Sequence, residues 1–252
     1  MAHPLALTGE RTLPSVAGEE YWYARHEAAY RWITTTYADR IAGSVVVEAG
    51  SGEGYGAALL RASGARAVVA LEYDEAAVSH SATSYADVAT ARANLAAMPL
   101  APRSADLLVS LQVVEHLWDL AGFLRDALGV LRAGGLAVLS TPNRPVFSPG
   151  LGRGQKPTNP FHVEELDADQ LRELLSTAGF ADVAVRGLHH GPRLLAWESE
   201  NGTSLVTAQV AAALSGRTDP GLASFVATVT ADDFVVGASD YAHDLIATAV
   251  RP

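Results

Sequence analysis

The segment Val45–Gly54 constrains the fold of this chain more than any other. Three valines precede an acidic residue, and glycines then stand at every second position, in the order Glu48-Ala-Gly50-Ser-Gly52-Glu-Gly54. An apolar run that ends in a glycine turn and leads directly into a helix is typical of α/β folds, in which backbone N–H groups approach a nucleotide-like ligand. The sequence therefore predicts a buried parallel strand, a tight turn and a helix directly after it.

The spacing of the glycines limits the kind of ligand. The dinucleotide fingerprint G-x-G-x-x-G requires glycine or alanine at position 55, where this chain has Tyr55. The observed pattern G-x-G-x-G, with Glu48 two residues before the first glycine, argues against a ligand that carries a pyrophosphate. A glycine turn alone is a weak signal, because the same residues also suit an ordinary strand-to-helix turn.

Composition narrows the class of protein. The chain has 252 residues, 49% of them hydrophobic, which suits one α/β domain with a large sheet buried between helices. A net charge of -10, with only 18 lysines and arginines, argues against binding of nucleic acid. Cysteine is absent, which excludes disulfides, thiolate catalysis and cysteine-ligated metals. Neither a signal peptide nor an apolar run of membrane-spanning length is visible, so we expect a soluble, cytoplasmic protein.

Short apolar runs alternate with helical segments along the chain. This alternation predicts βαβ crossovers and a mostly parallel sheet with helices on both faces. The predicted strands are 45–48, 67–71, 88–91, 106–110, 136–140, 181–187 and 244–250, and the predicted helices are 21–38, 54–63, 74–85, 120–131 and 167–178. A stretch rich in proline and glycine from 141 to 160 predicts a functional loop, such as a lid or a substrate wall.

Polar residues also follow the second and third predicted strands. Glu72 ends the second strand, where a carboxylate can accept both hydroxyls of a ribose, and Tyr73 can lie flat on an adenine face. Asn94 and Leu95 follow the third strand and suit recognition of the adenine edge. The alternatives are that the acid at position 72 only opens a helix and that Asn94 only forms a turn.

The fourth predicted strand runs into Gln112-Val-Val-Glu115-His116 at the carboxyl edge of the sheet, where open α/β sheets bind ligands. Histidine is the side chain best suited to take a proton near neutral pH, so His116 is the candidate base. Glu115 can orient the imidazole or hold a substrate hydroxyl. A histidine that only packs in the core is the alternative.

Together these motifs resemble those of class I S-adenosylmethionine-dependent methyltransferases. The resemblance covers about residues 40–187 and rests on five motifs in order: Glu48-x-Gly50-x-Gly52-x-Gly54, Glu72, Asn94-Leu95, Glu115-His116-Leu117, and Gly134-Gly135 with Thr141-Pro142-Asn143. It implies a Rossmann-like, seven-stranded, mostly parallel sheet of order 3-2-1-4-5-7-6, whose last strand is antiparallel. Glu72 and Asn94 depart from the family's more usual aspartates, although both keep an acceptor oxygen.

The resemblance also implies S-adenosylmethionine as cofactor and S-adenosylhomocysteine as product. The expected cofactor contacts are Glu48, Gly50, Ser51, Gly52, Gly54, Glu72, Tyr73, Asn94, Leu95, Gln112 and Arg25. Arg25 would clamp the methionyl carboxylate from the N-terminal helix, and a surface salt bridge is its alternative role. The expected organisation is one methyltransferase domain over 1–252, with an N-terminal extension (1–40), a cofactor-binding core (41–187), a helical insertion that caps the substrate site (188–243) and a last strand (244–252).

The flanks resemble mycobacterial sugar O-methyltransferases of the intracellular methylmannose and methylglucose polysaccharide pathways. The segments that carry this resemblance are 8–14, 21–26, 159–162, 187–194 and 244–252. It implies methylation of a hydroxyl on a small mannoside or glucoside, and in its closest form the anomeric hydroxyl. The candidate acceptor-site residues are Tyr23, His26, Asn143, His162, His189 and His190. A packing or surface role is the alternative for each of these histidines.

Three hypotheses stay open on the sequence alone. The chain methylates a small saccharide, methylates another acceptor such as a quinone, phenol or amine, or binds the cofactor as a regulator without catalysis. The complete glycine turn and His116 argue against the regulator, and the histidine-rich rim favours the saccharide. A divalent metal, magnesium in particular, also stays open, with Glu115 and Asp119 as its oxygen ligands. We expect a monomer or a homodimer.

Overall fold

The computed structural model describes residues 12–14 and 16–252. Its strands are β1 (Val45–Ala49), β2 (Ala67–Glu72), β3 (Ala89–Arg92), β4 (Ala105–Leu111), β5 (Leu131–Pro142), β6 (Ala181–His190), β7 (Phe234–Gly237) and β8 (Asp244–Val250). Its α-helices are α1 (Glu20–Thr36), α2 (Ala38–Ile41), α3 (Tyr55–Ala62), α4 (Glu75–Ser84), α5 (Leu120–Val130), α6 (Arg144–Phe147), α7 (Ala168–Thr177), α8 (Pro192–Asn201), α9 (Leu205–Ser215) and α10 (Pro220–Val226). Two 3₁₀ turns are also present, η1 (Val114–His116) and η2 (Ala231–Asp233).

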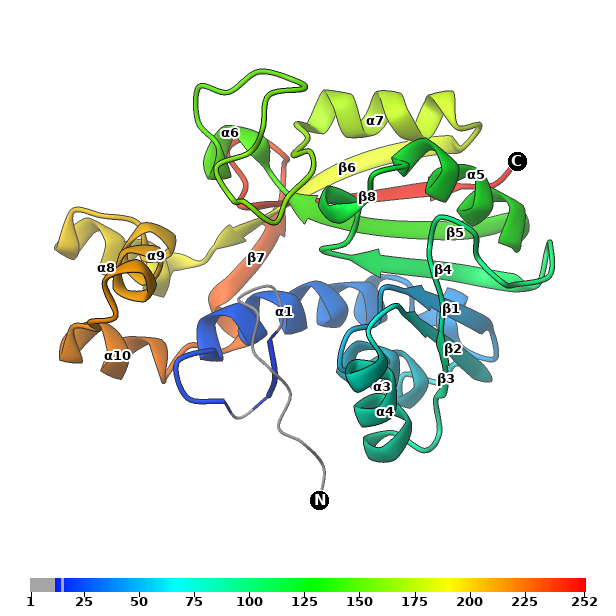
Figure 1. Cartoon of the computed structure of the whole chain (residues 1–252), viewed down its shortest axis with the longest axis horizontal. Helices are drawn as coiled ribbons and strands as arrows, with labels where there is room; N and C mark the ends of the chain where they lie inside the picture. Colours follow the sequence, from blue (N-terminus) through cyan, green and yellow to red (C-terminus); the bar gives the residue numbers. More distant parts are fainter. Residues whose placement is uncertain (1–11, 15) are drawn as a thin grey trace.

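The strands form a central sheet that helices cover on both faces (Figure 1). The strand order is β3-β2-β1-β4-β5-β8-β6-β7. Neighbouring strands from β3 to β5 pair in parallel, whereas β8 runs antiparallel to both β5 and β6. The predicted Rossmann-like sheet of order 3-2-1-4-5-7-6 is thereby confirmed, with β8 as its seventh strand.

The sheet has one strand more than the sequence predicts. Strand β7 pairs antiparallel with the end of β6, from Gly187 opposite Gly237 to His190 opposite Phe234. Strand β6 therefore continues three residues past its predicted end at Gly187. The four residues of β7 lie in a segment that is otherwise helical, and their partner strand lies more than 40 residues earlier, so no local pattern marks them as a strand.

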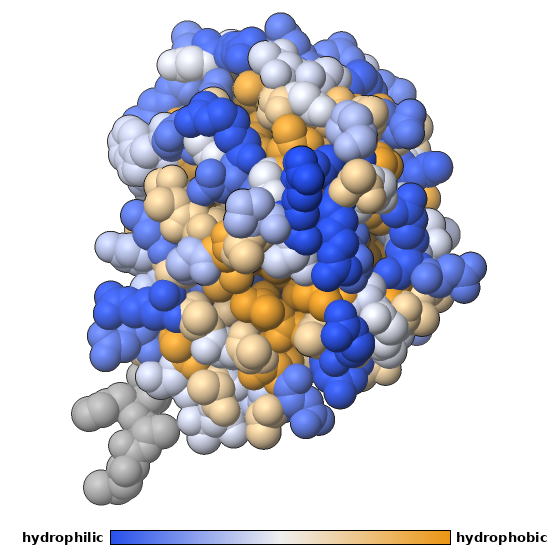
Figure 2. Space-filling view, turned by 90° about the vertical axis from the view of Figure 1, so that its right-hand side faces the viewer, coloured by the Kyte–Doolittle hydropathy of each residue, from blue (hydrophilic) through white to orange (hydrophobic). Residues whose placement is uncertain are grey.

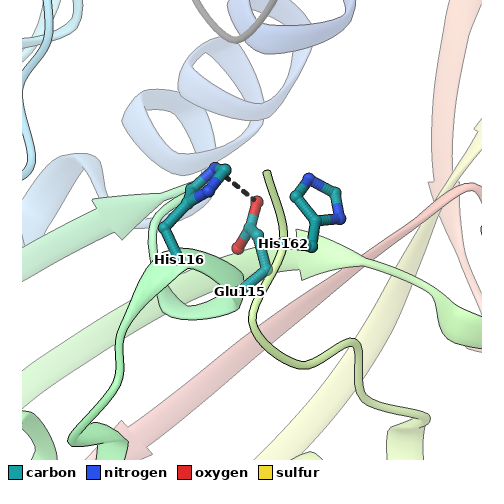
Figure 3. Close-up of side chains that lie close together, drawn as sticks. All are labelled: Glu115, His116 and His162. Carbon is teal, nitrogen blue, oxygen red and sulfur yellow. Dashed lines mark ion pairs between the residues drawn. The ribbon is translucent and has the colours of Figure 1, made fainter. Parts of the chain in front are cut away.

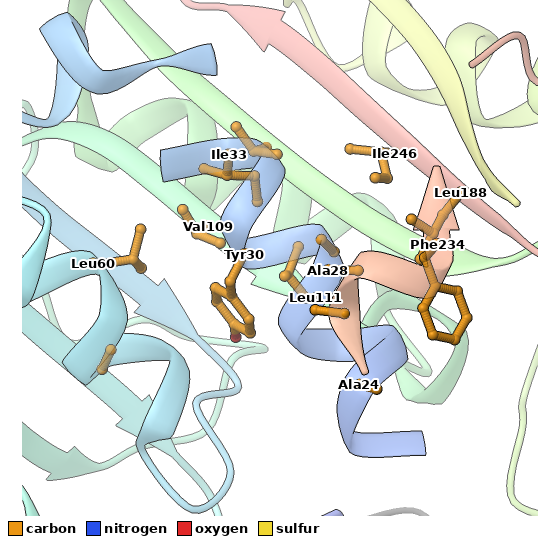
Figure 4. Packing of buried hydrophobic residues seen from close by; sticks show 14 of the residues in the cluster. Ala24, Ala28, Tyr30, Ile33, Leu60, Val109, Leu111, Leu188, Phe234 and Ile246 are labelled. Carbon is orange, nitrogen blue, oxygen red and sulfur yellow. The ribbon is translucent and has the colours of Figure 1, made fainter. Parts of the chain in front are cut away.

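Apolar side chains alternate between the two faces of the sheet, as strand geometry requires. In β4, Leu107 and Val109 pack into the core on the side of α1, whereas Leu108 packs into the core on the side of α5 and α7. Figure 4 shows the first of these cores, where Ile33 and Tyr30 of α1 lie over the sheet beside Leu60 of α3. Helix α1 is thereby fixed against the strands that end at the site described below.

Helices α8, α9 and α10 gather beyond one end of α1, at the left of Figure 1. Leu194, Leu205 and Leu222 from these helices belong to the same core as α1.

Figure 2 views the opposite side of the molecule, from which β4 and β5 begin, and there hydrophilic residues surround a central group of apolar ones. Among the described residues, no helix combines the length and the hydropathy needed to cross a bilayer.

We expect Ile33→Ala to lower the free energy of unfolding by roughly 2–5 kcal/mol, because it removes a fully buried side chain from the core between α1 and the sheet. The matched control is Val210→Ala in α9, whose side chain is 45% exposed and whose change should stay within about 0.5 kcal/mol. Urea unfolding followed by circular dichroism measures both values. Equal losses in the two variants would contradict the packing described for α1.

Candidate active site

A cavity of about 740 Å³ lies at the carboxyl ends of the parallel strands. Its volume is within the range of about 300–1,000 Å³ that is typical of small-molecule sites. Eight of the eleven residues predicted to bind a cofactor line it: Gly50, Ser51, Gly52, Glu72, Tyr73, Asn94, Leu95 and Gln112. The predicted base His116, the predicted acceptor-site residue His26 and Asp119 line the same cavity. The sequence motifs from four different strands are thus brought together in one place.

The turn after β1 has the backbone conformation that the glycine pattern predicts. Gly50, Gly52 and Gly54 have φ angles of 80°, 50° and 88°, which residues other than glycine rarely adopt. A Cβ atom on Gly50 would lie 2.4 Å from a methyl group of Val113, so the turn packs directly against the loop after β4. Glycine at position 50 is required for both reasons.

Glu72 is fixed at the cavity wall by backbone donors. Its Oε2 accepts from the N–H of Gly52 at 2.9 Å, and its Oε1 accepts from the N–H groups of Tyr73 and Asp74 at 2.8 Å each. The carboxylate is therefore held beside the glycine turn in one orientation. This is the position expected for an acid that receives ribose hydroxyls.

Glu48 and Gly54 do not line the cavity, contrary to their predicted cofactor contacts. Glu48 lies beneath the turn, fully buried, and accepts a hydrogen bond from the Tyr30 hydroxyl at 2.5 Å. Burial raises the pKa of the Glu48 carboxyl to about 8. A Cβ on Gly54 would lie 2.2 Å from the Ser81 hydroxyl, so this glycine permits packing of the turn against α4. Both residues support the turn from behind.

Arg25 also differs from its prediction, because it is buried and does not line the cavity. Its guanidinium donates two hydrogen bonds to Asp244, at the start of β8. Gln112, which does line the cavity, donates from Nε2 to the same carboxylate at 3.2 Å and has a left-handed φ of 54°. Arg25 therefore joins α1 to β8 and to the cavity wall, and its guanidinium is engaged by Asp244.

The predicted base lies in a cluster with Glu115 and His162 (Figure 3). The Nδ1–H of His116 donates to the backbone carbonyl of Phe161 at 3.1 Å, so in the neutral ring Nε2 carries the lone pair. This Nε2 lies 4.0 Å from Oε1 of Glu115. His162 lies behind His116, and its Nδ1 is 2.7 Å from Glu165.

Glu115 is buried behind His116 and does not itself line the cavity. Its Oε2 accepts from the hydroxyl of Thr141 at 3.0 Å. Burial raises the pKa of the Glu115 carboxyl to about 7. A carboxylate in this position stabilises a positive charge on the adjacent imidazole, which the role of His116 as a base requires.

In the part of the chain that the structure describes, two groups of side chains could hold a metal, His190 with Glu198 and His243, and a group in the cavity region that differs from the predicted pair. One ligand atom each from Glu115, His116 and His162 lies within 4.8 Å of the others, and Asp119 is not in this group. Asp119 instead caps α5, where its Oδ1 accepts from the N–H of Gly122 at 2.8 Å. Two imidazoles and one carboxylate suit a transition metal better than magnesium, which prefers oxygen ligands. The expected magnesium site of Glu115 and Asp119 is therefore not supported.

Four predicted acceptor-site residues lie outside the cavity wall in addition to His162: Tyr23, Asn143, His189 and His190. The ring of Tyr23 packs edge-on against Tyr55, and Asn143 donates to the carbonyl of Ala242 at 2.8 Å. Their side chains hold neighbouring segments together.

The two adjacent histidines at the end of β6 serve packing as well. His189 lies 2.7 Å from the carbonyl of Ala238. His190 is buried between the Tyr21 hydroxyl at 2.6 Å and Glu198 at 3.1 Å, and its ring stacks on His243. Burial lowers the pKa of His190 to about 3, so this ring is neutral at physiological pH. These contacts fix α8 to α1.

Several lining residues were not predicted from the sequence: Thr12, Tyr30, Glu53, Tyr55, Trp118 and Phe161. Tyr55 stands at the position that excluded the dinucleotide pattern, and its hydroxyl lies 2.8 Å from Nδ1 of His26. Trp118 directly follows the Glu-His-Leu motif, and this position could have marked it as a residue of the cavity wall. Positions 8–11, which contributed to the sugar-methyltransferase resemblance, lie outside the described residues.

Comparison with known proteins decides the family. The model of the methyltransferase domain family matches residues 21–185. The chain belongs to the S-adenosylmethionine-dependent methyltransferases. It is 48% identical to a "Probable S-adenosylmethionine-dependent methyltransferase" of Mycobacterium tuberculosis, over 98% of this chain and 90% of that protein. A relative from Mycolicibacterium smegmatis with the same description is 46% identical, over 98% of this chain and 96% of the relative.

Solved methyltransferase structures share the fold of this chain. One from Thermotoga maritima gives a TM-score of 0.58 at 13% identity and covers 93% of this chain and 98% of its own. One from Mesorhizobium loti gives a TM-score of 0.58 at 18% identity and covers 89% of this chain and 99% of its own. The resemblance to class I methyltransferases is confirmed, and S-adenosylmethionine as the cofactor follows from family membership.

We expect Gly50→Ala to weaken binding of S-adenosylhomocysteine at least tenfold. The turn requires a positive φ angle at position 50, which alanine disfavours, and the added methyl group would meet the side chain of Val113. The turn must therefore move. Gly129→Ala in α5 is the matched control, because its added methyl group meets nothing within 4 Å beyond its chain neighbours and the backbone of its own helix. Isothermal titration calorimetry compares the three proteins, and an unchanged affinity in Gly50→Ala would contradict the site.

The raised pKa of Glu48 predicts a pH-dependent stability in the cofactor-free protein. Between its ordinary pKa of 4.5 and about 8, the folded protein holds a proton that the unfolded chain releases. The free energy of unfolding should therefore fall as pH rises through this range, with a slope of at most about 1.4 kcal/mol per pH unit from this group.

Glu48→Gln removes this titration and keeps an acceptor for the Tyr30 hydroxyl. The variant should show a flatter profile in urea unfolding at about pH 5.5, 7 and 8.5. Glu115 contributes with the same sign up to about pH 7, so Glu115→Gln should flatten the lower part of the range. A wild-type slope retained in Glu48→Gln would show that this carboxyl is ionised in the folded protein.

Proposed function

We propose that this chain is an O-methyltransferase that transfers the methyl group of S-adenosylmethionine to a hydroxyl of a small mannoside or glucoside, in the synthesis of polymethylated polysaccharides. The orientation of His116 carries the proposal. Its ring lines the same cavity as the glycine turn and Glu72, its Nδ1–H is bonded to a carbonyl, and Nε2 is therefore the basic atom of the ring. A hydroxyl acceptor needs such a base, because a protonated oxygen is a weak nucleophile.

The proposed cofactor contacts follow the cavity wall. The turn at Gly50–Gly52 would approach the nucleoside and methionine portions, and Glu72 would receive the ribose hydroxyls. Tyr73 would cover one face of the adenine, and Asn94 with Leu95 would meet its edge. When bound, S-adenosylmethionine supplies an electrophilic methyl group on a sulfonium, whose sulfur keeps the bonding electron pair on transfer.

The protein's part in the reaction is to position the acceptor and to move one proton. Nε2 of His116 would accept the proton that the acceptor hydroxyl loses during the transfer. The Phe161 carbonyl holds the ring in place, and Glu115 at 4.0 Å stabilises the imidazolium that forms. These roles assign general-base catalysis to His116 and orientation to Glu115.

Two observations support a saccharide acceptor. The flanks of the chain resemble sugar O-methyltransferases, and the cavity wall combines hydrogen-bonding groups, such as Thr12, His26 and Asp119, with aromatic rings. The wall also contains Leu111, Val113 and Leu117, which would suit the competing class of phenolic acceptors. The candidate base argues against a regulator without catalysis.

A screen with cofactor labelled in the methyl group tests the acceptor class. Mannosides, glucosides, their partly methylated oligosaccharides, catechols and simple amines are offered to the purified chain, and labelled products are resolved by chromatography. We expect label in saccharides only. Label only in catechols or amines would refute the saccharide proposal, and label in none of them would leave the methyltransferase without any of the proposed acceptors.

With the acceptor that is found, His116→Ala should lower kcat by about 10²–10⁴, because the general base is lost. Its affinity for S-adenosylhomocysteine should stay within about twofold of wild type. His80→Ala in α4 is the matched control, since His80 lies outside the cavity wall and should leave kcat unchanged. Full turnover by His116→Ala with normal cofactor binding would remove this residue from the mechanism.

A further inference from the structure

Two exposed aromatic side chains line the cavity beside His116. Trp118 is 90% exposed and Phe161 is 57% exposed, although both are large and apolar. Trp118 follows His116 by two residues, and the carbonyl of Phe161 holds the His116 ring at 3.1 Å. Both aromatic residues therefore lie on backbone segments that adjoin the candidate base.

Trp118 stands apart from the other tryptophans of the chain. The chain has four tryptophans, and the other three, Trp22, Trp32 and Trp197, are partly buried and pack against the core between α1 and the sheet. Trp118 belongs to neither hydrophobic core. Because its exposure leaves a large apolar surface in water, and this surface borders the cavity, a ligand rather than the fold accounts for it best.

The chemistry of this wall favours a neutral ring with an apolar face. The aromatic rings offer flat apolar surfaces, and Asp119 beside Trp118 offers a carboxylate that can accept hydrogen bonds from hydroxyl groups. The protein carries a net charge of -10, which disfavours an anionic ligand. Two side chains are also far too small an area for a protein partner, which needs about 800 Å² on each side. A pyranose ring matches this wall, because one of its faces presents only C–H groups and its edge carries hydroxyls.

We propose that Trp118 and Phe161 form a second saccharide subsite, which binds the sugar ring next to the ring that is methylated. The inference rests on the proposed function, and it adds that the acceptor has at least two rings. The methylated ring lies at His116, and its neighbour lies on the aromatic wall at the cavity mouth. The enzyme thereby selects an oligosaccharide over a free monosaccharide.

The test compares a mannose disaccharide with the matching monosaccharide as acceptors. Trp118→Ala should raise the KM for the disaccharide roughly tenfold, which corresponds to about 1.4 kcal/mol, and should change the KM for the monosaccharide less than twofold. The kcat for each acceptor and the affinity for S-adenosylhomocysteine should stay at their wild-type values. Trp118→Phe should restore part of the loss, because it keeps a flat ring.

Tyr241→Ala is the matched control, since Tyr241 is 88% exposed and lies outside the cavity wall. It should leave both KM values unchanged. Equal changes in the KM for both acceptors, or none beyond the Tyr241→Ala control, would overturn the subsite. A weaker affinity for S-adenosylhomocysteine in Trp118→Ala would overturn it as well, by assigning Trp118 to the cofactor.

A binding measurement separates this inference from the proposed function. If the wild-type chain methylates no saccharide, the proposed function fails, and the subsite is tested by titrating the S-adenosylhomocysteine complex with the disaccharide. A shift in tryptophan emission that is present in wild type and absent in Trp118→Phe would support the subsite. No shift in wild type would overturn it.

Discussion

The close contact between Gly50 and Val113 is the constraint on which the rest of the site depends. Strands β1 and β4 are parallel neighbours, so the turn after one and the loop after the other emerge side by side. The hydroxyl of Ser110 in β4 also donates to the carbonyl of Ala49 in β1 at 2.7 Å. Because glycine at position 50 leaves room for Val113, the cofactor turn lies directly beside the segment that carries Gln112 and His116. A methyl donor and a base can therefore share one cavity.

Buried polar pairs hold this arrangement from behind. Tyr30 of α1 donates to Glu48 under the turn, Arg25 of α1 pairs with Asp244 at the start of β8, and Gln112 shares that carboxylate. Loss of one partner of such a pair leaves an uncompensated buried charge or polar group, which is strongly destabilising. Helix α1 thus positions the cavity wall through two polar contacts, although only His26 and Tyr30 of this helix line the cavity.

Local rules account for what the sequence could predict. The glycine turn follows from its φ angles, the strands follow from apolar periodicity, and His116 follows from its place after a central strand. Failures occurred where the outcome depends on a distant partner. Arg25 pairs with a residue 219 positions away, and His190 bonds to Tyr21 at a separation of 169. Polar residues of this kind look available in the sequence, and only the tertiary structure shows that they are already engaged.

The position of the thioether sulfur in a crystal structure with S-adenosylhomocysteine tests the central claim most directly. The proposed chemistry predicts that the ribose hydroxyls bind Glu72 and that the sulfur faces the cavity beside His116, with space for an acceptor oxygen between the sulfur and Nε2. A sulfur that is directed away from His116, or a nucleoside bound away from the Gly50–Gly52 turn, would contradict the claim that methyl transfer occurs in this cavity.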